Sequence, residues 1–471
     1  MNLNERLARG SDIASAAALG ALTGRIDETL LDGVRTKRAD RPSDPHAELK
    51  GRIHRACIDR LGSAIYTIDS NEELATLVRN TVAEELVLDR TPLTREERVR
   101  SERELTDDIL GYGPLEPYLR DETVTEIMVN GAYNIYIERD GKIEEVDDLA
   151  FTDDAHVLRI IDRIVSQVGR RIDESSPMVD ARLPDGSRVN AIIPPLSLRG
   201  PILTIRKFAQ DPYSLADLAV FGTLTTTSAE FLAQCIRGKA NVIISGGAGS
   251  GKTTIFNALS AFVPGNERII TIEDAAELQL QQRHVVSLES RPANIEGQGE
   301  VRIRELVRNA VRMRPDRIIV GEVRGPETLD MLQAMNTGHE GSLTTIHANS
   351  PRDALHRLEM LTLMAGVELP LRAIREQIAS AFDLAVHLVR LVDGSRRVSR
   401  VSEIVGMEGD VITMQDIFLA RSEDDDSFAR AGRLSLLGPL RPTGIVPSFL
   451  PKLATQGVEI PARLFEAEAL E

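Results

Sequence analysis

A glycine-rich segment of eight residues has the residue types and the spacing to hold a chain of phosphates. It reads G-x-x-x-x-G-K-T over 246–253, follows the apolar run 242–244, and precedes the helix-forming stretch 254–259. Glycines expose backbone N–H groups without steric obstruction, and the start of a helix favours negative charge. In this pattern Lys252 neutralises the β and γ phosphates and Thr253 ligates Mg²⁺. The sequence therefore predicts a nucleotide-binding motor or switch, in which ATP is bound by Gly246, Gly247, Ala248, Gly249, Ser250, Gly251, Lys252, Thr253 and Thr254.

Two acidic residues follow predicted strands at places where hydrolysis would use them. Glu273 comes after the apolar run 269–272, and Glu322 comes after the run 318–320. Hydrolysis needs an anchor for the metal and a carboxylate that orients or deprotonates water, and open α/β sheets bind their ligands at the carboxyl ends of the strands. An acidic residue after a strand also suits a solvated turn, so each residue alone leaves both interpretations open.

Two histidines lie near the last of these strands. His347 follows the run 343–346 and is a candidate hydrogen-bond donor to the γ-phosphate, while His339 lies in the glycine-flanked segment 338–341. Metal binding by these two residues would need a third ligand. A histidine at a strand end is also often a satisfied structural donor.

Arg304, Arg308 and Arg312 are spaced four residues apart in a segment with helical periodicity. Like charges at this spacing destabilise an isolated helix by about 0.2–0.5 kcal/mol per pair, unless an anionic partner compensates them. A solvated basic face and a subunit interface both remain open.

The elements that must position these residues divide the chain into several segments. Strand-like runs at 241–245, 268–272, 285–288, 317–320 and 343–346 alternate with helical patterns, which predicts a mainly parallel sheet wrapped by helices. Upstream, hairpin dipeptides at 130–131 and 140–141 predict a second sheet, and helical spacing predicts a bundle before it. The predicted boundaries are a flexible tail at 1–49, a helical bundle at 50–119, an α+β sheet domain at 120–208, a linker at 209–224, the nucleotide-binding domain at 225–420, and an acidic loop with a C-terminal appendage at 421–471.

The composition excludes several classes of protein. No apolar run approaches the roughly 20 residues of a bilayer span, and the Ala-rich patch 13–22 follows Glu5, so we expect a cytoplasmic protein without a signal peptide. Two distant cysteines, Cys57 and Cys235, predict neither a disulfide framework nor a zinc site. A net charge of -16, 4% aromatic residues and no Trp disfavour nucleic acid as the main substrate.

These motifs, in this order, resemble the type II and type IV secretion and pilus-assembly ATPases, and most closely the CpaF/TadA-type motors of tight-adherence pilus systems. The motifs that carry the resemblance, over about 50–418, are the glycine-rich loop, the segments 271–277, 308–324 and 337–349, and the upstream signatures at 111–117, 126–131 and 203–208. Some pilus and type II motors carry a tetracysteine zinc subdomain, which two cysteines cannot supply, and this favours the tight-adherence branch.

The resemblance implies a C-terminal RecA-like P-loop domain, a smaller PAS-like N-terminal domain and a homohexameric ring that works with inner-membrane platform proteins. It makes Glu273 and Glu322 the acidic pair, one activating water and the other holding Mg²⁺ with Thr253, partly through water. The choice between them stays open, with Glu273 preferred as the base. It also implies that arginines of the N-terminal domain complete the site, with Arg206 first and then Arg188 and Arg199.

The sequence thus predicts a cytoplasmic, Mg²⁺-dependent ATPase that powers pilus assembly or protein secretion and associates with the inner membrane through partners. One alternative is a nucleic-acid motor or recombinase of the RecA-like class, which would need a basic channel that the composition does not indicate. Another is a nucleotide-dependent hub with little turnover, and the paired carboxylates argue against it. Alanine at Arg206 should preserve ATP binding and abolish turnover.

Overall fold

The computed structural model describes residues 46–466, apart from gaps at 63–67, 69, 90, 140, 147–150, 209–212, 292, 294–297 and 423–436. Residues 1–45 of the expected tail and the acidic residues within 423–436 therefore lie outside the described residues, whereas residues 47–49 are not part of a tail but begin the first described helix. Within those ranges, no helix is both long enough and apolar enough to cross a membrane.

The first described segment is a layer of helices with its own small core. Apolar side chains spaced three or four residues apart, such as Val78 and Val82, face the neighbouring helices and are fully buried. Thr94 and Glu97 form a reciprocal capping box that fixes the start of the third helix. The helices are α4 Ala47–Leu61, α6 Asn71–Leu88 and α7 Arg95–Leu110, followed by the short turns η1 Gly113–Leu115 and α8 Glu116–Arg120.

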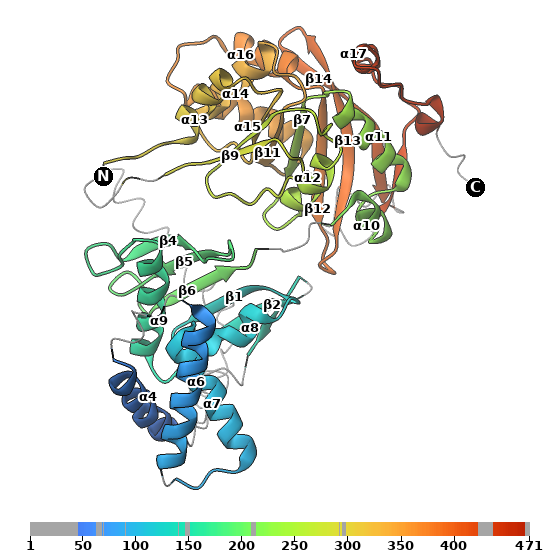
Figure 1. Cartoon of the computed structure of the whole chain (residues 1–471). Helices are drawn as coiled ribbons and strands as arrows, with labels where there is room; N and C mark the ends of the chain where they lie inside the picture. The colour runs from blue at the N-terminus through green and yellow to red at the C-terminus, as the bar shows by residue number, and fades with distance from the viewer. Residues whose placement is uncertain are drawn as a thin grey trace, which may run out of the picture.

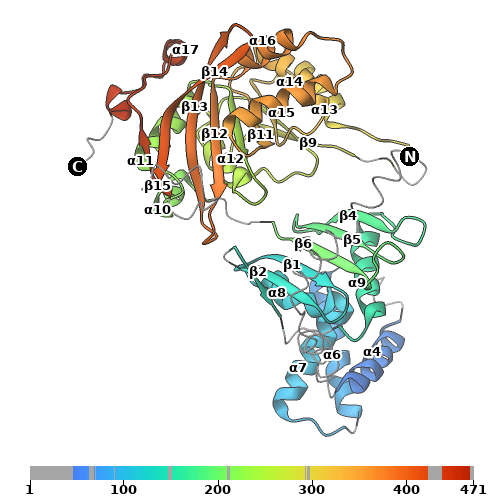
Figure 2. The ribbon, with the colours of Figure 1, turned by 180° about the vertical axis from the view of Figure 1, so that it is seen from behind.

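A six-stranded antiparallel sheet follows, with the order β3-β2-β1-β6-β5-β4. Alternating side chains of its strands pack on one long helix, whose apolar face buries Val157, Ile161 and Ile164 among others. Figures 1 and 2 show this sheet between the helical layer and the larger unit of the chain. Its elements are β1 Val124–Asn130, β2 Ile135–Arg139, β3 Lys142–Glu145, α9 Asp154–Gln167, β4 Met178–Arg182, β5 Arg188–Ile192 and β6 Ile202–Arg206.

The larger unit is built on a nine-stranded sheet with the order β15-β14-β13-β12-β7-β11-β10-β8-β9. Its strands from β12 to β9 are parallel, as the alternation of strand and helix predicts, whereas β13, β14 and β15 extend it as an antiparallel meander. The strands are β7 Val242–Gly246, β8 Ile269–Glu273, β9 Val285–Glu289, β10 Arg317–Val320, β11 Leu343–His347, β12 Leu384–Arg390, β13 Arg396–Glu408, β14 Val411–Ser422 and β15 Leu437–Pro442. The helices are α10 Leu215–Val220, α11 Thr226–Arg237, α12 Lys252–Ser260, α13 Ile303–Ala310, α14 Glu327–Asn336, α15 Pro351–Leu363, α16 Leu371–Ala381 and α17 Leu450–Thr455, with turns η2 Val311–Met313 and η3 Ala462–Phe465.

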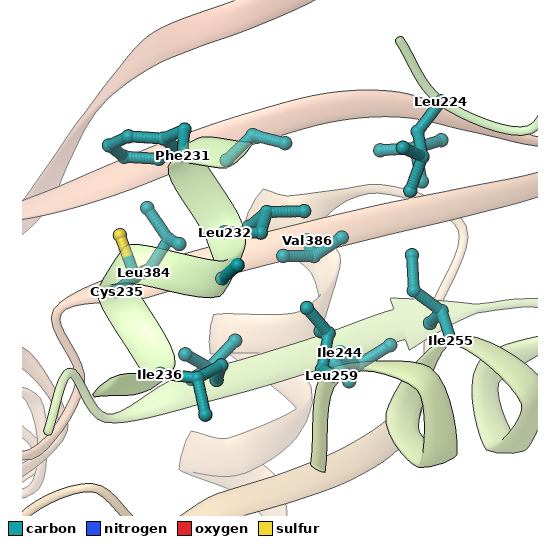
Figure 3. Close-up of a cluster of buried hydrophobic side chains, with 14 of the residues drawn as sticks. Leu224, Phe231, Leu232, Cys235, Ile236, Ile244, Ile255, Leu259, Leu384 and Val386 are labelled. Atoms are coloured by element: carbon teal, nitrogen blue, oxygen red, sulfur yellow. The ribbon is translucent and has the colours of Figure 1, made fainter. Parts of the chain in front are cut away.

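Helices cover both faces of this sheet, so successive residues of its central strands enter different cores. Val242 and Ile244 of β7 pack with α11 and α12, as Figure 3 shows for Ile244 beside Leu232 and Leu259. Ile243, between them, packs in the second cluster on the opposite face, which contains residues of α14, α15 and α16. Burial on both faces explains why β7 reads as a continuous apolar run rather than an alternating one.

Two segments differ from the predicted organisation. The predicted linker contains α10, whose Leu215 and Leu218 are buried in the main cluster. Residues 437–465 do not form a separate appendage, because β15 pairs with β14 and Leu453 and Phe465 pack in that same cluster with Phe231. The capping box of Ser214 and Asp217 is a local signal for the start of α10, whereas the place of residues 437–465 depends on contacts with residues far away in the chain.

The arginines of α13 find their anionic partner within the chain. Arg304 Nε and Arg308 Nε each donate to a different oxygen of the largely buried Asp330 carboxylate on α14, both over 2.7 Å. The third arginine, Arg312, is exposed. The repulsion between Arg304 and Arg308 is therefore compensated by a carboxylate of the helix that follows in the same unit.

Candidate active site

The glycine-rich loop connects the end of β7 to the start of α12. Gly249 and Gly251 have φ angles of +65° and +92°, which only glycine adopts readily. At Gly246 an added Cβ would lie 2.5 Å from Ser250 Oγ and 2.6 Å from the carbonyl of Leu388. The loop is thus too tight for any side chain at this position, and the start of α12 is left open toward a ligand, as a phosphate cradle requires.

Lys252 is buried at the first turn of α12. Its Nζ donates to the carbonyls of Gly246 and Gly247 over 3.1 and 2.8 Å and lies 3.4 Å from Nδ1 of His347. Burial lowers its pKa, the nearby Glu322 raises it, and the positive charge of Arg206 lowers it. The ammonium therefore lies near three of the predicted site residues, His347, Glu322 and Arg206.

Glu322 follows β10, and β11 lies between β10 and the strand β7 that leads into the loop. Its Oε2 accepts from Arg324 Nη2 over 2.6 Å, and its Oε1 lies 3.0 Å from Nε2 of His347. That Oε1 is buried and faces the His347 ring, although no described residue gives it a well-aligned hydrogen bond. Burial lowers the pKa of His347, which favours the neutral ring at physiological pH. Glu322 is therefore held by Arg324 at one oxygen and lies against the His347 ring at the other.

Glu273 at the end of β8 has a different environment. Only 5% of it is exposed, and its Oε1 accepts the backbone N–H groups of Glu277 and Leu278 over 2.9 and 3.1 Å. Burial raises its pKa to about 7, against the opposing effect of those two N–H groups. A carboxyl with a pKa near neutrality suits a general base. The two backbone hydrogen bonds also hold the loop after β8 in place.

The hard oxygen donors near the loop fit Mg²⁺. Thr253 Oγ1 donates to Glu277 Oε2 over 3.3 Å, and Oε1 of Glu322, to which no described residue donates a well-aligned hydrogen bond, is a second carboxylate oxygen. Among the described residues, no group of three or more His, Cys, Asp or Glu side chains is arranged to hold a metal ion. That donor set suits a cation that keeps several waters and takes further oxygens from a nucleotide.

Two arginines of the six-stranded sheet contact the loop after β8, and a third lies beside them in the sheet. Strand pairing places Arg206 opposite Arg188 and Arg188 opposite Arg182, so the three share one face at one end of the sheet. Arg188 Nη1 contacts Glu277 over 2.9 Å, and its Nη2 donates to the carbonyl of Ala275. Arg206 is exposed.

Two of the predicted site residues lie elsewhere. Arg199 precedes β6, whereas Arg206 ends it, so the two residues lie at opposite ends of that strand. His339 precedes β11, and its Nδ1 lies 3.1 Å from the carbonyl of Ala334 at the end of α14. β11 pairs with β7 in register from Leu343 to His347, so His339 lies at the edge of the sheet opposite the glycine-rich loop. A strand of five residues spans roughly 17 Å, which separates both side chains from a ligand at the loop.

Three further residues contact the groups of this site: Glu277 and Arg324 lie in the motifs 271–277 and 308–324 but had no assigned role, and Arg182 was not marked at all. Arg182 contacts Glu289 over 3.0 Å and donates to the carbonyl of Ala276. Glu277 joins Thr253 to Arg188, and Arg324 holds Glu322. The Asp185-Gly186 turn could have revealed Arg182, because a hairpin closed there brings residues 182 and 188 opposite each other.

Comparison with known proteins agrees with this geometry. The family model described as type II/IV secretion system protein matches residues 108–431. A putative conjugal transfer protein of Mycobacterium tuberculosis (strain H37Rv) is 36% identical over 333 residues, which cover 69% of this chain and 94% of that protein. Conjugal transfer protein TrbB of Rhizobium radiobacter is 37% identical over 295 residues, or 62% of this chain and 86% of TrbB.

Among solved structures, the VirB11 ATPase of the Brucella suis type IV secretion system is 30% identical, with a TM-score of 0.33, and the match covers 61% of this chain and 94% of that one. The predicted α/β fold is confirmed, with a C-terminal RecA-like P-loop domain, a smaller N-terminal α+β domain and helices before it. The family model covers more than half of the chain and includes the complete phosphate loop. The chain therefore belongs to the type II/IV secretion system protein family, and it is an ATPase of that family.

Proposed function

We propose that this chain is the hexameric motor of a tight-adherence type pilus or secretion system, and that it works in the cytoplasm on an inner-membrane platform. The observation that carries the motor role is that the site is built from two units of the chain. Lys252 begins α12, and Glu322 and His347 lie at strand ends of the RecA-like domain, while Arg188 and Arg206 approach from the N-terminal sheet. Closing these units on ATP would convert hydrolysis into movement.

Each residue of the site has a proposed task in hydrolysis. The loop Gly246–Thr253 binds the phosphate chain, and Lys252 neutralises its β and γ phosphates. Thr253, Glu277 and Glu322 would hold Mg²⁺, which supplies positive charge against the developing negative charge of the transferred phosphoryl group. Glu273 takes the proton of the attacking water, because its raised pKa near 7 matches that task.

Arg206 is proposed to stabilise the transition state from the N-terminal sheet. It is exposed, and its positive charge lowers the pKa of Lys252. Arg188, whose buried Nε has no hydrogen-bond partner among the described residues, is proposed as the second arginine of the site. An arginine that reaches the transferred phosphoryl group contributes about 10³- to 10⁵-fold to turnover, so catalysis would depend on the closure of the two units.

The test is steady-state ATP hydrolysis by size-fractionated protein, with and without single-stranded DNA. The wild type is compared with Lys252→Ala, Glu322→Gln and Arg206→Ala, and Arg199→Ala serves as the matched control from the other end of β6. Turnover that is confined to a hexamer-sized fraction, is lost in the three site variants, is kept in Arg199→Ala and is indifferent to DNA would support the motor. Stimulation by DNA would favour a nucleic-acid motor, and full turnover in Arg206→Ala would remove that arginine from the site.

A further inference from the structure

An acidic residue of the N-terminal sheet reaches the phosphate loop through an arginine of the RecA-like domain. Arg396, at the start of β13, donates from Nε to the carbonyl of Gly249 over 3.0 Å. Its Nη2 lies 3.8 Å from Oε1 of Glu138 on β2, a side chain that is only 13% exposed. One guanidinium thus contacts both the loop that binds phosphate and the domain that must close on it.

The surrounding contacts hold this arrangement in place. Arg390, at the end of β12, lies 4.0 Å from the same oxygen of Glu138 and donates to the carbonyl of Gly141, in the turn between β2 and β3. An added Cβ on Gly249 would lie 3.2 Å from Arg390 Nη1, and one on Gly251 would lie 3.2 Å from Arg396 Cδ. The two arginines therefore pack directly against the positive-φ glycines of the loop.

The hydrogen bond from Arg396 also affects which way the N–H groups of the loop point. A peptide group whose carbonyl is fixed on one side presents its neighbouring N–H groups to the other side, so holding the Gly249 carbonyl helps orient the loop for an anion. Glu138 in turn limits the rotamers of Arg396, and the distance between the two side chains depends on where the N-terminal sheet lies. This arrangement makes the shape of the phosphate loop sensitive to the position of the other domain.

We propose that Arg396 is a positioning residue for nucleotide binding and that Glu138, across the domain boundary, positions Arg396. The proposal rests on the proposed function of this site as the place where ATP is bound and hydrolysed. It adds a second connection between the two domains, made to the backbone of the loop rather than to the phosphates.

The test is a double-mutant cycle with Glu138→Gln, Arg396→Ala and the pair, read as the affinity for a fluorescent ATP analogue and as KM and kcat. Arg396→Ala should weaken binding about tenfold, the usual effect of one charged hydrogen bond, and Glu138→Gln about threefold, because its contacts are longer and partly solvated. If Glu138 acts through Arg396, the pair should be no weaker than Arg396→Ala alone. KM should rise while kcat stays within about twofold.

Arg400→Ala is the matched control, since Arg400 lies on the same strand and contacts Asp416 instead. Arg396→Lys keeps the charge and loses the Nε donor, and it should give a smaller loss than alanine; wild-type affinity in both variants would overturn the proposal. Multiplicative effects in the pair, about thirtyfold, would show that Glu138 does not act through Arg396. Binding is read separately from turnover, so a wild type that binds but does not hydrolyse ATP would count against the proposed function and leave the cycle interpretable.

Discussion

Replacing Glu273 with glutamine should make the protein more stable, and increasingly so as the pH rises. The carboxyl is almost completely buried, and burial raises its pKa to about 7 from the ordinary value of 4.5. The folded protein therefore holds this proton more tightly than the unfolded chain does. The resulting contribution to stability is complete below about pH 4.5 and is lost as the pH rises through about 7. Glutamine never ionises, and its side-chain oxygen still accepts from the N–H groups of Glu277 and Leu278.

The size of the effect follows from the two pKa values. Each unit of difference corresponds to about 1.4 kcal/mol, so the full loss is roughly 3 kcal/mol, of which about 2.5 kcal/mol falls between pH 5 and pH 8. Other groups titrate in the same range, but they do so in both proteins. The stability difference between variant and wild type should therefore grow by about 2.5 kcal/mol over this interval.

Urea denaturation of both proteins at pH 5 and pH 8, followed by fluorescence of a dye that reports exposed apolar surface, measures this difference. The exposed Glu408, on β13 of the same sheet, provides the control substitution Glu408→Gln. A difference between Glu273→Gln and wild type that stays constant with pH would refute the reasoning, because it would mean that folding does not change the proton affinity of this carboxyl.

Three further substitutions test other parts of the structure. Gly341→Ala should destabilise the fold by about 2–4 kcal/mol in urea denaturation, because φ is +79° and the new Cβ would lie 2.8 Å from Nη1 of the fully buried Arg317; unchanged stability would contradict this packing. Asp330→Asn should cost about 1 kcal/mol by weakening the contacts with two arginines of α13, and the loss should shrink in 1 M salt; a salt-independent loss in thermal unfolding would exclude the electrostatic explanation. Leu453→Ala should cost about 2–5 kcal/mol in the same urea assay, since this side chain is completely buried, and a cost below 1 kcal/mol would show that the segment after β15 is not part of the core.

Local patterns predicted the phosphate loop and the strands that carry it. The loop is specified by its own glycines and lysine. The five strand runs were found within one or two residues of their ends, and four of them, all but the edge strand β9, read as apolar because they are buried on both faces. Glu273, Glu322 and His347 followed from their places after three of these runs. Such residues all lie at the carboxyl edge of a parallel sheet, so position along the chain was enough to bring them together.

Closeness in the sequence did not predict closeness in space where a strand lies between two residues. Arg199 and Arg206 are close in the chain, but a strand lies between them, and the same reason separates His339 from His347. Arg182 was missed for the opposite reason, because only the pairing of β4 with β5 brings it beside Arg188. The place of β15 in the sheet depends on contacts across the unit, for which a six-residue segment carries no signal.

The same C-terminal packing determines when the RecA-like core can be completed during synthesis. Arg463 of η3 contacts Glu230 of α11 across 233 residues of sequence, and Phe465 packs on Phe231. At about 5–20 residues per second, translation separates these partners by roughly ten to fifty seconds. During that time α11 exposes the apolar surface that Figure 3 shows in its buried state, including Phe231 and Cys235. A nascent chain of this protein thus carries an incomplete core until residues 437–465 emerge, and this apolar surface is open to aggregation during that interval.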